Sequence, residues 1–281
     1  MKIHRMRVVL GIMLIAGLAL AGLSWADAAG DAYDEGSRLF HAGELRQAIA
    51  AFDKAIRLKP DYAEAYNGRG IAYDTLAQYE RAIKDYDAAI RLNPRSAEFY
   101  YNRGNVYSDS GQQEHAVKDY DAAIGLNPAY AEAHFNRGLS YLSLGRSEAA
   151  ADARDYLSLK GWREDNSQYM VLAGYFGDRR AQRDAEARKL LDEAVTKCDT
   201  STWPYPIIRY LRHEITANAL LAAATDNDKK TEAHAYLGLD LALSDQREAA
   251  LTHLRWVKEN GNKGLIEYTF TLAELRRLEG P

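Results

Sequence analysis

The chain has 281 residues, a formal net charge of −4 at pH 7 and one cysteine. A chain of this length forms one or two ordinary domains, or one continuous solenoid. The slightly acidic balance argues against a dedicated nucleic-acid binder, which normally presents a basic face. Because Cys198 is the single cysteine, the chain cannot form an intramolecular disulfide, and we expect this thiol to be at least half-buried.

Residues 1–28 predict a secretory signal peptide. Three basic residues precede an unbroken apolar run over residues 8–23, and small residues place the cleavage site after Ala26 or Ala28. The run is short for a membrane span, and no cysteine follows it that could carry a lipid. We therefore expect a periplasmic or secreted mature chain without stable membrane insertion. The alternative is an inner-membrane protein anchored by an uncleaved segment.

One pattern then recurs at an interval of 34 residues. Its clearest copies are AEAYNGRGIAYDTLAQYERAIKDYDAAIRLNP, which starts at Ala63, and AEFYYNRGNVYSDSGQQEHAVKDYDAAIGLNP, which starts at Ala97. Looser copies lie on each side. The same interval separates the prolines at positions 60, 94 and 128 and the glycines at positions 36, 70, 104 and 138. A period of this length is typical of a helical solenoid.

Each copy predicts a helix, a turn and a second helix. In the second copy, the residues that share a helix face at spacings of three and four are Tyr66, Gly70 and Tyr73, then Ala82, Tyr86 and Ala89. Gly70 and Ala82 are small where the two helices must cross closely, since larger side chains would overpack the crossing. Pro94 ends the second helix, because the residue before proline is disfavoured in the helical conformation.

These positions resemble the tetratricopeptide-repeat (TPR) signature. The third copy matches it with Tyr100, Gly104, Tyr107, Ala116, Tyr120, Ala123 and Pro128. The first copy lacks the leading aromatic residue, and the fourth has Arg154 in place of a later aromatic and no closing proline. The resemblance implies an all-α fold, a right-handed TPR superhelix (α-solenoid) of helix-turn-helix repeats. Within residues 29–162 the repeats are expected at 29–62, 63–96, 97–130 and 131–162.

After Trp162 the interval fades, but helical periodicity persists through residues 163–281. The elements expected there are degenerate repeats at about 166–199 and 231–264, short helices at 207–211 and 217–224, and a capping helix at 265–278. Thr216 should cap the second short helix through its hydroxyl. The capping helix should cover the last repeat with an apolar side made of Leu265, Tyr268, Leu272, Leu275 and Leu278.

This second half also resembles the C-terminal half of the NlpI-type TPR lipoproteins. The residues that carry the likeness are Trp203, Ile207, Ile208, Tyr210, Leu211, Ile215, the run Ala224–Asn227, the run Tyr236–Gly238, the run Ile266–Tyr268 and the run Leu272–Leu275. The resemblance implies a periplasm-facing adaptor that holds peptidoglycan hydrolases and a processing protease, and that forms homodimers. The lipid-anchoring cysteine of that family is missing here, and its N-terminal dimerisation helices have no evident match. Membrane tethering and a homodimer therefore stay open.

No motif predicts catalysis, a cofactor or a metal site. The seven histidines are scattered, with no pair at metal-ligand spacing, and no P-loop, G-x-S-x-G or H-E-x-x-H string occurs. His134 and His234 occupy the leading aromatic position of a repeat, where packing is the better interpretation. We expect no enzyme and no cofactor; an enzyme with a site in the irregular residues 162–226 is the less favoured alternative.

Charged residues recur with the repeats. Arg69, Arg103 and Arg137 hold one position on three successive first helices, and the aspartates at 85, 87, 119 and 121 lie on second helices. We predict a ladder of Arg–Asp pairs between the two helices of a repeat or with its neighbour. The alternative is a basic strip for anionic partners.

The first helices of stacked repeats line a concave groove. By the geometry of the family that this chain resembles, the groove side chains are Asn67, Ile71, Asp74, Tyr101, Asn105, Asp109, Phe135, Leu139 and Leu142. Mixed aromatic, amide and apolar groups suit an extended peptide or a partner helix. We therefore expect an adaptor for protein or peptide clients, among which cell-wall hydrolases or a periplasmic protease fit the resemblance. The alternative is a structural, self-associating protein whose groove is filled by its own chain or a second copy.

Overall fold

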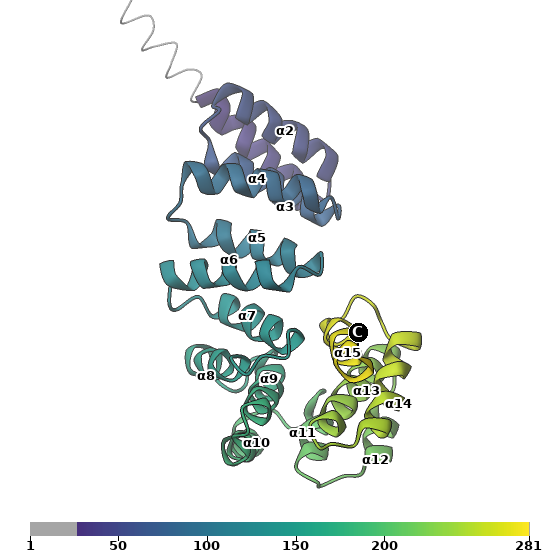
Figure 1. The fold of residues 1–281 in the computed structure, drawn as a ribbon. Coiled ribbons are helices and arrows are strands. Elements are labelled where there is room, and N and C mark those ends of the chain that lie inside the picture. The colour runs from purple at the N-terminus through teal and green to yellow at the C-terminus, as the bar shows by residue number, and fades with distance from the viewer. Residues whose placement is uncertain (1–26, 281) are drawn as a thin grey trace, which may run out of the picture. The chain divides into compact units, whose positions relative to one another are not determined.

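A computed structural model describes residues 27–280 of the chain (Figure 1). Every regular element in this range is helical, which confirms the predicted fold class. The predicted signal peptide lies almost entirely outside the described residues. None of the helices between residues 27 and 280 has the length and apolar character needed to span a bilayer.

The helices follow one another with short connections. After a helical stretch over residues 27–41 come α2 (Leu45–Leu58), α3 (Ala63–Thr75), α4 (Tyr79–Leu92), α5 (Ala97–Asp109), α6 (Gln113–Leu126), α7 (Ala131–Ser143), α8 (Ala149–Lys160), α9 (Ser167–Arg180), α10 (Asp184–Lys197), α11 (Tyr205–Leu211), α12 (Ala217–Ala223), α13 (Asn227–Ala242), α14 (Arg247–Asn260) and α15 (Ile266–Glu279). The described chain forms two compact units, residues 27–106 and residues 107–280, and their boundary falls within α5.

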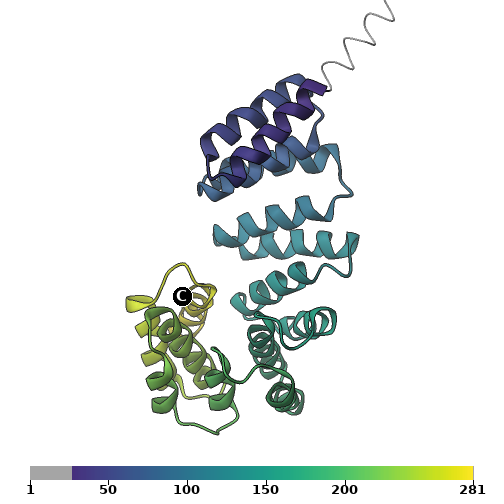
Figure 2. The same cartoon turned by 180° about the vertical axis from the view of Figure 1, so that it is seen from behind.

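In the first unit, α3 and α4 form the helical hairpin predicted for the second repeat (Figures 1 and 2). Gly70 lies against the ring of Tyr86, and a Cβ atom at Gly70 would come within 3.0 Å of that ring. Tyr86 is 1% exposed and Ala82 is fully buried. The close helix crossing predicted from these small residues is therefore confirmed.

The second unit contains the predicted degenerate helix pairs, α9 with α10 and α13 with α14. Thr216 caps α12 as expected, because its Oγ1 accepts a hydrogen bond from the Ala219 amide at 3.2 Å. Helix α13 begins at Asn227, before the expected start of its repeat. Asp226 explains the earlier start, because its carboxylate accepts the Lys229 amide at 2.9 Å and caps the added turn.

The last helix, α15, packs against α13 and α14, and also against α7 (Figure 1). The predicted apolar side is only part of what it buries. Leu275 is buried and packs with Leu251 and Leu254 of α14, while Leu272 is half-buried there. On other positions α15 also buries Phe270, Thr271 and two carboxylates, Glu267 and Glu274.

Those buried carboxylates are tolerated because other helices supply hydrogen-bond donors. The Tyr236 hydroxyl of α13 donates to Glu267 at 3.0 Å, and Arg180 of α9 donates to Glu274 at 2.6 Å. The apolar side predicted for α15 does not include these two carboxylates. Their burial, together with that of Phe270, shows that α15 is enclosed on more than one side.

Candidate functional site

The arginines of the first helices form the predicted ladder. Arg69 of α3 donates to both oxygens of Asp85 on α4, at 2.7 and 2.6 Å, and also pairs with Asp53 on α2. The Asp85 side chain is 7% exposed and that of Asp53 is 35% exposed. One guanidinium therefore ties the second helix of its own repeat to the second helix of the preceding repeat.

The next two arginines also pair with the second helix of the preceding repeat. Arg103 donates to Asp87 of the preceding repeat at 2.5 Å. Arg137 donates to Asp121 of the preceding repeat at 2.6 Å and to both oxygens of Asp152 on α8, at 2.9 and 2.6 Å. The arrangement confirms the ladder over the basic strip, since these guanidinium groups are engaged by carboxylates of the chain itself.

Among the groove residues of the first unit, Asn67 differs from the prediction. It is 7% exposed, its Nδ2 donates to Glu98 at 3.2 Å, and its Oδ1 accepts from Asn102 at 3.0 Å. Asn67 therefore links α3 to α5 and is not positioned to bond a partner. The other predicted groove residues of this unit are half-buried: Ile71, Asp74, Tyr101 and Asn105.

In the second unit, one of the three predicted groove residues of α7 lies in the core. Leu142 is 1% exposed and belongs to the same buried cluster as Phe270 of α15. Phe135 and Leu139 are half-buried and pack against this cluster, whereas Asp109 is exposed. Leu142 is therefore a core residue, which corrects its predicted place on an open groove.

The reason is the position of α15. Helix α7 contacts α6, α8 and α9, and it also contacts α15. A hypothetical side chain at Gly145, just past the end of α7, would meet the guanidinium of Arg277 from α15. The chain's own last helix therefore covers part of the surface of α7.

A buried carboxyl pair lies elsewhere in the second unit. Glu232 of α13 accepts hydrogen bonds from Trp203 Nε1 at 2.8 Å and from the Tyr169 hydroxyl at 3.3 Å. Burial, and next the negative charge of Glu267, raise the pKa of Glu232 to about 8. Burial also raises the pKa of Glu267. Sequence reasoning missed this pair, because the repeat interval fades after Trp162 and no repeat pattern aligns α15 with α13.

Two histidines also meet, although their sequence spacing does not suggest it. His234 Nδ1 lies 2.9 Å from His253 Nδ1, and the His234 ring stacks on Trp256 with centroids 4.0 Å apart. Burial, and next the charge of His253, lower the pKa of His234 to about 4, and burial lowers the pKa of His253. At neutral pH both rings are uncharged, and one nitrogen donates to the other. This contact fits the packing role expected for His234.

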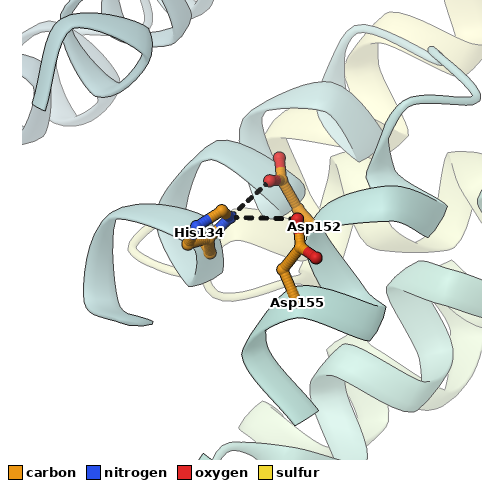
Figure 3. A group of neighbouring side chains, drawn as sticks. All are labelled: His134, Asp152 and Asp155. Atoms are coloured by element: carbon orange, nitrogen blue, oxygen red, sulfur yellow. Dashed lines mark hydrogen bonds and ion pairs between the residues drawn. The ribbon is translucent and has the colours of Figure 1, made fainter. Parts of the chain in front are cut away.

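A third group combines a histidine with two aspartates (Figure 3). His134 Nδ1 lies 2.9 Å from an oxygen of Asp152 and 3.6 Å from an oxygen of Asp155, both on α8. His134 Nε2 lies 3.1 Å from the Pro128 carbonyl oxygen. The ring is therefore held by polar contacts as well as by packing. The signal that could have found this group is the 34-residue register of the ladder, because Asp155 follows Asp121 at the interval that separates Asp53, Asp87 and Asp121.

Cys198 is buried, as expected. Burial raises the pKa of its thiol to about 11. The thiol is therefore protonated at neutral pH, and the nucleophilic thiolate is scarce.

Comparison with known proteins identifies the repeats. A family model described as "TPR repeat" matches residues 36–76, 77–111 and 104–145. Residues 36–145 thus carry TPR repeats, and these include the second and third copies of the pattern. No curated protein matches the chain.

Solved structures show the same fold over a larger part of the chain. A tetratricopeptide repeat protein from Parabacteroides merdae covers 88% of this chain and 99% of its own, with 16% identity and a TM-score of 0.59. The MamA protein covers 68% of this chain and 97% of its own, with 22% identity and a TM-score of 0.54. YrrB, described as a TPR protein with an unusual peptide-binding site, covers 66% and 91%, with 21% identity and a TM-score of 0.54. Likeness at these identities establishes the fold and leaves the function to be argued from the site.

Proposed function

We propose that the protein is a TPR adaptor that holds a peptide segment of a client protein on the first helices α3 and α5. The observation that carries this proposal is the set of half-buried side chains Ile71, Asp74, Tyr101 and Asn105, which lie on these two helices within one compact unit. A half-buried side chain is held in position by its neighbours and still exposes surface that a client can contact. The description of YrrB as a peptide-binding TPR protein supports the same use of the fold.

The chemistry of this set fits an extended peptide. Ile71 and Tyr101 offer apolar contact area, and an aromatic ring does so at a low cost in conformational entropy. The Asn105 amide can donate to and accept from a peptide backbone, and the Asp74 carboxylate favours a basic side chain on the client. We therefore expect clients with apolar side chains next to a lysine or arginine.

A structural role is supported for a different part of the chain. Because α15 packs against α7 and Leu142 is buried, that part of the predicted groove serves the fold. This corresponds to the alternative in which the groove is filled by the protein's own chain. The proposed client surface is therefore confined to α3 and α5.

We further propose that the adaptor acts in the bacterial envelope, near peptidoglycan hydrolases or a protease that processes them. The support is the predicted signal peptide of residues 1–28 and the resemblance of residues 203–275 to NlpI-type proteins. Mass spectrometry of the protein from a periplasmic fraction should give a mature chain that starts at Asp27 or Ala29. A full-length chain found in the cytoplasm would overturn this part of the proposal.

The client surface is tested by the double variant Tyr101→Ala, Asn105→Ala. We expect it to lose most of the proteins that crosslink to the wild-type chain in its own cell, with unchanged helicity by circular dichroism. The matched control is Glu80→Ala, Lys84→Ala, which changes two exposed residues of α4 in a neighbouring repeat and should keep full capture.

Three outcomes distinguish the interpretations. Recovery of a hydrolase or protease by the wild-type chain and the control, but not by the double variant, supports the envelope adaptor. Equal capture by the double variant removes α3 and α5 as the client surface. Recovery of the protein's own copies alone favours the structural interpretation.

A further inference from the structure

The Arg–Asp ladder ends at a carboxylate that has no arginine. The aspartates that receive an arginine from the following repeat recur at one register: Asp53, Asp87 and Asp121. Asp155 on α8 continues this register, again 34 residues later. The position that would supply its arginine is Val171, a fully buried core residue of α9. Within residues 27–280, the ion pair that Asp155 makes is the 3.6 Å contact with His134.

The His134 ring is oriented so that one nitrogen faces this carboxylate. Its Nε2 faces the Pro128 carbonyl oxygen at 3.1 Å, and a carbonyl can only accept, so Nε2 carries the proton. A carboxylate also only accepts, so the contact of Nδ1 with Asp152 is a hydrogen bond only while Nδ1 carries a proton. When a metal ion displaces that proton, the lone pair of Nδ1 points toward oxygens of Asp152 and Asp155. Three electron-pair donors meet here on two helices of one hairpin, as Figure 3 shows. A backbone carbonyl on the second ring nitrogen is also how metal-binding histidines are commonly held.

The charges around this point are unbalanced. Asp121, Asp152 and Asp155 bring three negative charges, and Arg137 brings one positive charge that is shared between Asp121 and Asp152. Two negative charges are left over, which is the charge that a divalent cation neutralises. Arg137 holds the Asp152 carboxylate in place by donating to both of its oxygens, as residues behind a metal ligand do.

We propose that His134 Nδ1, one oxygen of Asp152 and one oxygen of Asp155 bind a divalent transition-metal ion of the zinc class. Ligands about 2.1 Å from a tetrahedral ion lie about 3.4 Å apart, and the Nδ1 to oxygen distances here are 2.9 and 3.6 Å. An imidazole ligand favours zinc over magnesium or calcium, which prefer all-oxygen sites.

The site opens to solvent on one side. His134, Arg137 and Asp155 line a surface pocket together with Ile124, Pro128, Ser158 and Leu159. The Asp155 side chain is 57% exposed, whereas those of His134 and Asp152 are 6% and 1% exposed. The ion therefore enters from the pocket, water completes its coordination, and the ion joins α7 to α8 where the ladder lacks its next arginine.

Zinc binding by the full purified chain tests the proposal. After treatment with EDTA and dialysis, titration calorimetry with zinc chloride at pH 7 should show one ion per chain. The His134 Nδ1 resonance should shift in a nitrogen-15 spectrum of the histidine side chains. Asp155→Ala should weaken binding at least about tenfold, the lower bound seen even for residues behind the ligands. Because Asp155 is largely exposed, this variant should keep the wild-type circular dichroism spectrum.

The matched control is His253→Gln, which removes the contact between His253 and His234 and should leave zinc binding unchanged. No zinc uptake, with protons on both nitrogens of His134, would show that an imidazolium ion alone neutralises the aspartates and would overturn the proposal. Zinc binding that is lost in His253→Gln and kept in Asp155→Ala would also overturn it.

Discussion

One arginine of the ladder forms ion pairs with two carboxylates, one exposed to solvent and one buried. Arg69 pairs with Asp53, which is about one-third exposed, and with Asp85, which is buried. An exposed carboxylate that loses its partner is solvated by water, whereas a buried one keeps an uncompensated charge. The two carboxylates that one arginine holds therefore differ in what they contribute to stability.

This difference gives a prediction for the ladder. We expect Arg69→Ala to lower the free energy of unfolding by about 3 kcal/mol, because Asp85 loses the guanidinium that holds it. Asp53→Ala should lower it by less than about 1 kcal/mol, because Arg69 keeps Asp85. Urea denaturation followed by circular dichroism measures both. Similar losses for the two variants would show that burial of Asp85 does not govern the pair.

The buried carboxyl pair predicts a pH dependence of stability. The carboxyl groups of the unfolded chain titrate near pH 4.5, whereas burial raises the pKa of Glu232 to about 8 and also raises that of Glu267. Between these values the folded state binds more protons than the unfolded state, so stability is present at low pH and is lost as the pH rises through this window. We expect the melting temperature to fall between pH 5 and pH 8, and Glu232→Gln to reduce that fall.

The control for this measurement is Glu248→Gln, since the Glu248 side chain is 83% exposed and its change should keep the wild-type profile. The same slope in Glu232→Gln and in the wild-type chain would count against proton uptake by the buried pair.

The two histidines His234 and His253 act in the opposite direction, because their lowered pKa values reduce stability as the pH falls below about 6.5.

At the scale of the element, α15 is the helix whose role differs most from the prediction. An amphipathic helix that only capped the last repeat would bury one stripe against α14. Helix α15 also buries Phe270, whose ring lies 5.4 Å from the ring of Tyr236 on α13, and it packs on α7. The helix therefore closes the second unit in addition to ending the stack.

The enclosed side of α15 should contribute more to stability than the side that faces α14. We expect Phe270→Ala to cost about 3–5 kcal/mol, because it leaves a cavity beneath a ring that is 1% exposed. Leu272→Ala, at a half-buried position, should cost clearly less. Chemical denaturation compares the two variants. A larger loss for Leu272→Ala would mean that α15 acts mainly as a cap on α14.

At the scale of the whole molecule, each hairpin depends on its sequence neighbours to cover apolar surface. The polar contacts obey the same principle, because Arg69, Arg137 and Asn67 each reach an adjacent repeat. Local contacts of this kind leave consecutive first helices in a fixed relation within a unit. The proposed client surface needs α3 and α5 to stay at fixed positions next to each other. The Tyr101→Ala, Asn105→Ala variant therefore tests whether the stacked helices bind a client together.

The sequence by itself determined the repeat and the contacts that its period sets. The helix pairs, the close approach at Gly70 and the Arg–Asp ladder all depend on residues within about one repeat of each other, and a fixed interval in the sequence keeps such residues at fixed places in space. The same reasoning predicted α9 and α10 from helical periodicity, and it predicted the Thr216 cap from a hydrogen bond within the first turn of a helix.

Only the tertiary structure decided what happens where the period fails. The packing of α15 on α7 brings together helices from separate parts of the chain, and Leu142 of α7 is buried. Glu232 and Glu267 are only about one repeat apart, but they meet where the repeat pattern no longer predicts the path of the chain. The group of His134 with Asp155 arises because the ladder register continues on α8 while Val171 takes the place of the next arginine. A sequence pattern specifies a contact only when the chain between its partners has a known path, and beyond the regular repeats that path is set by packing.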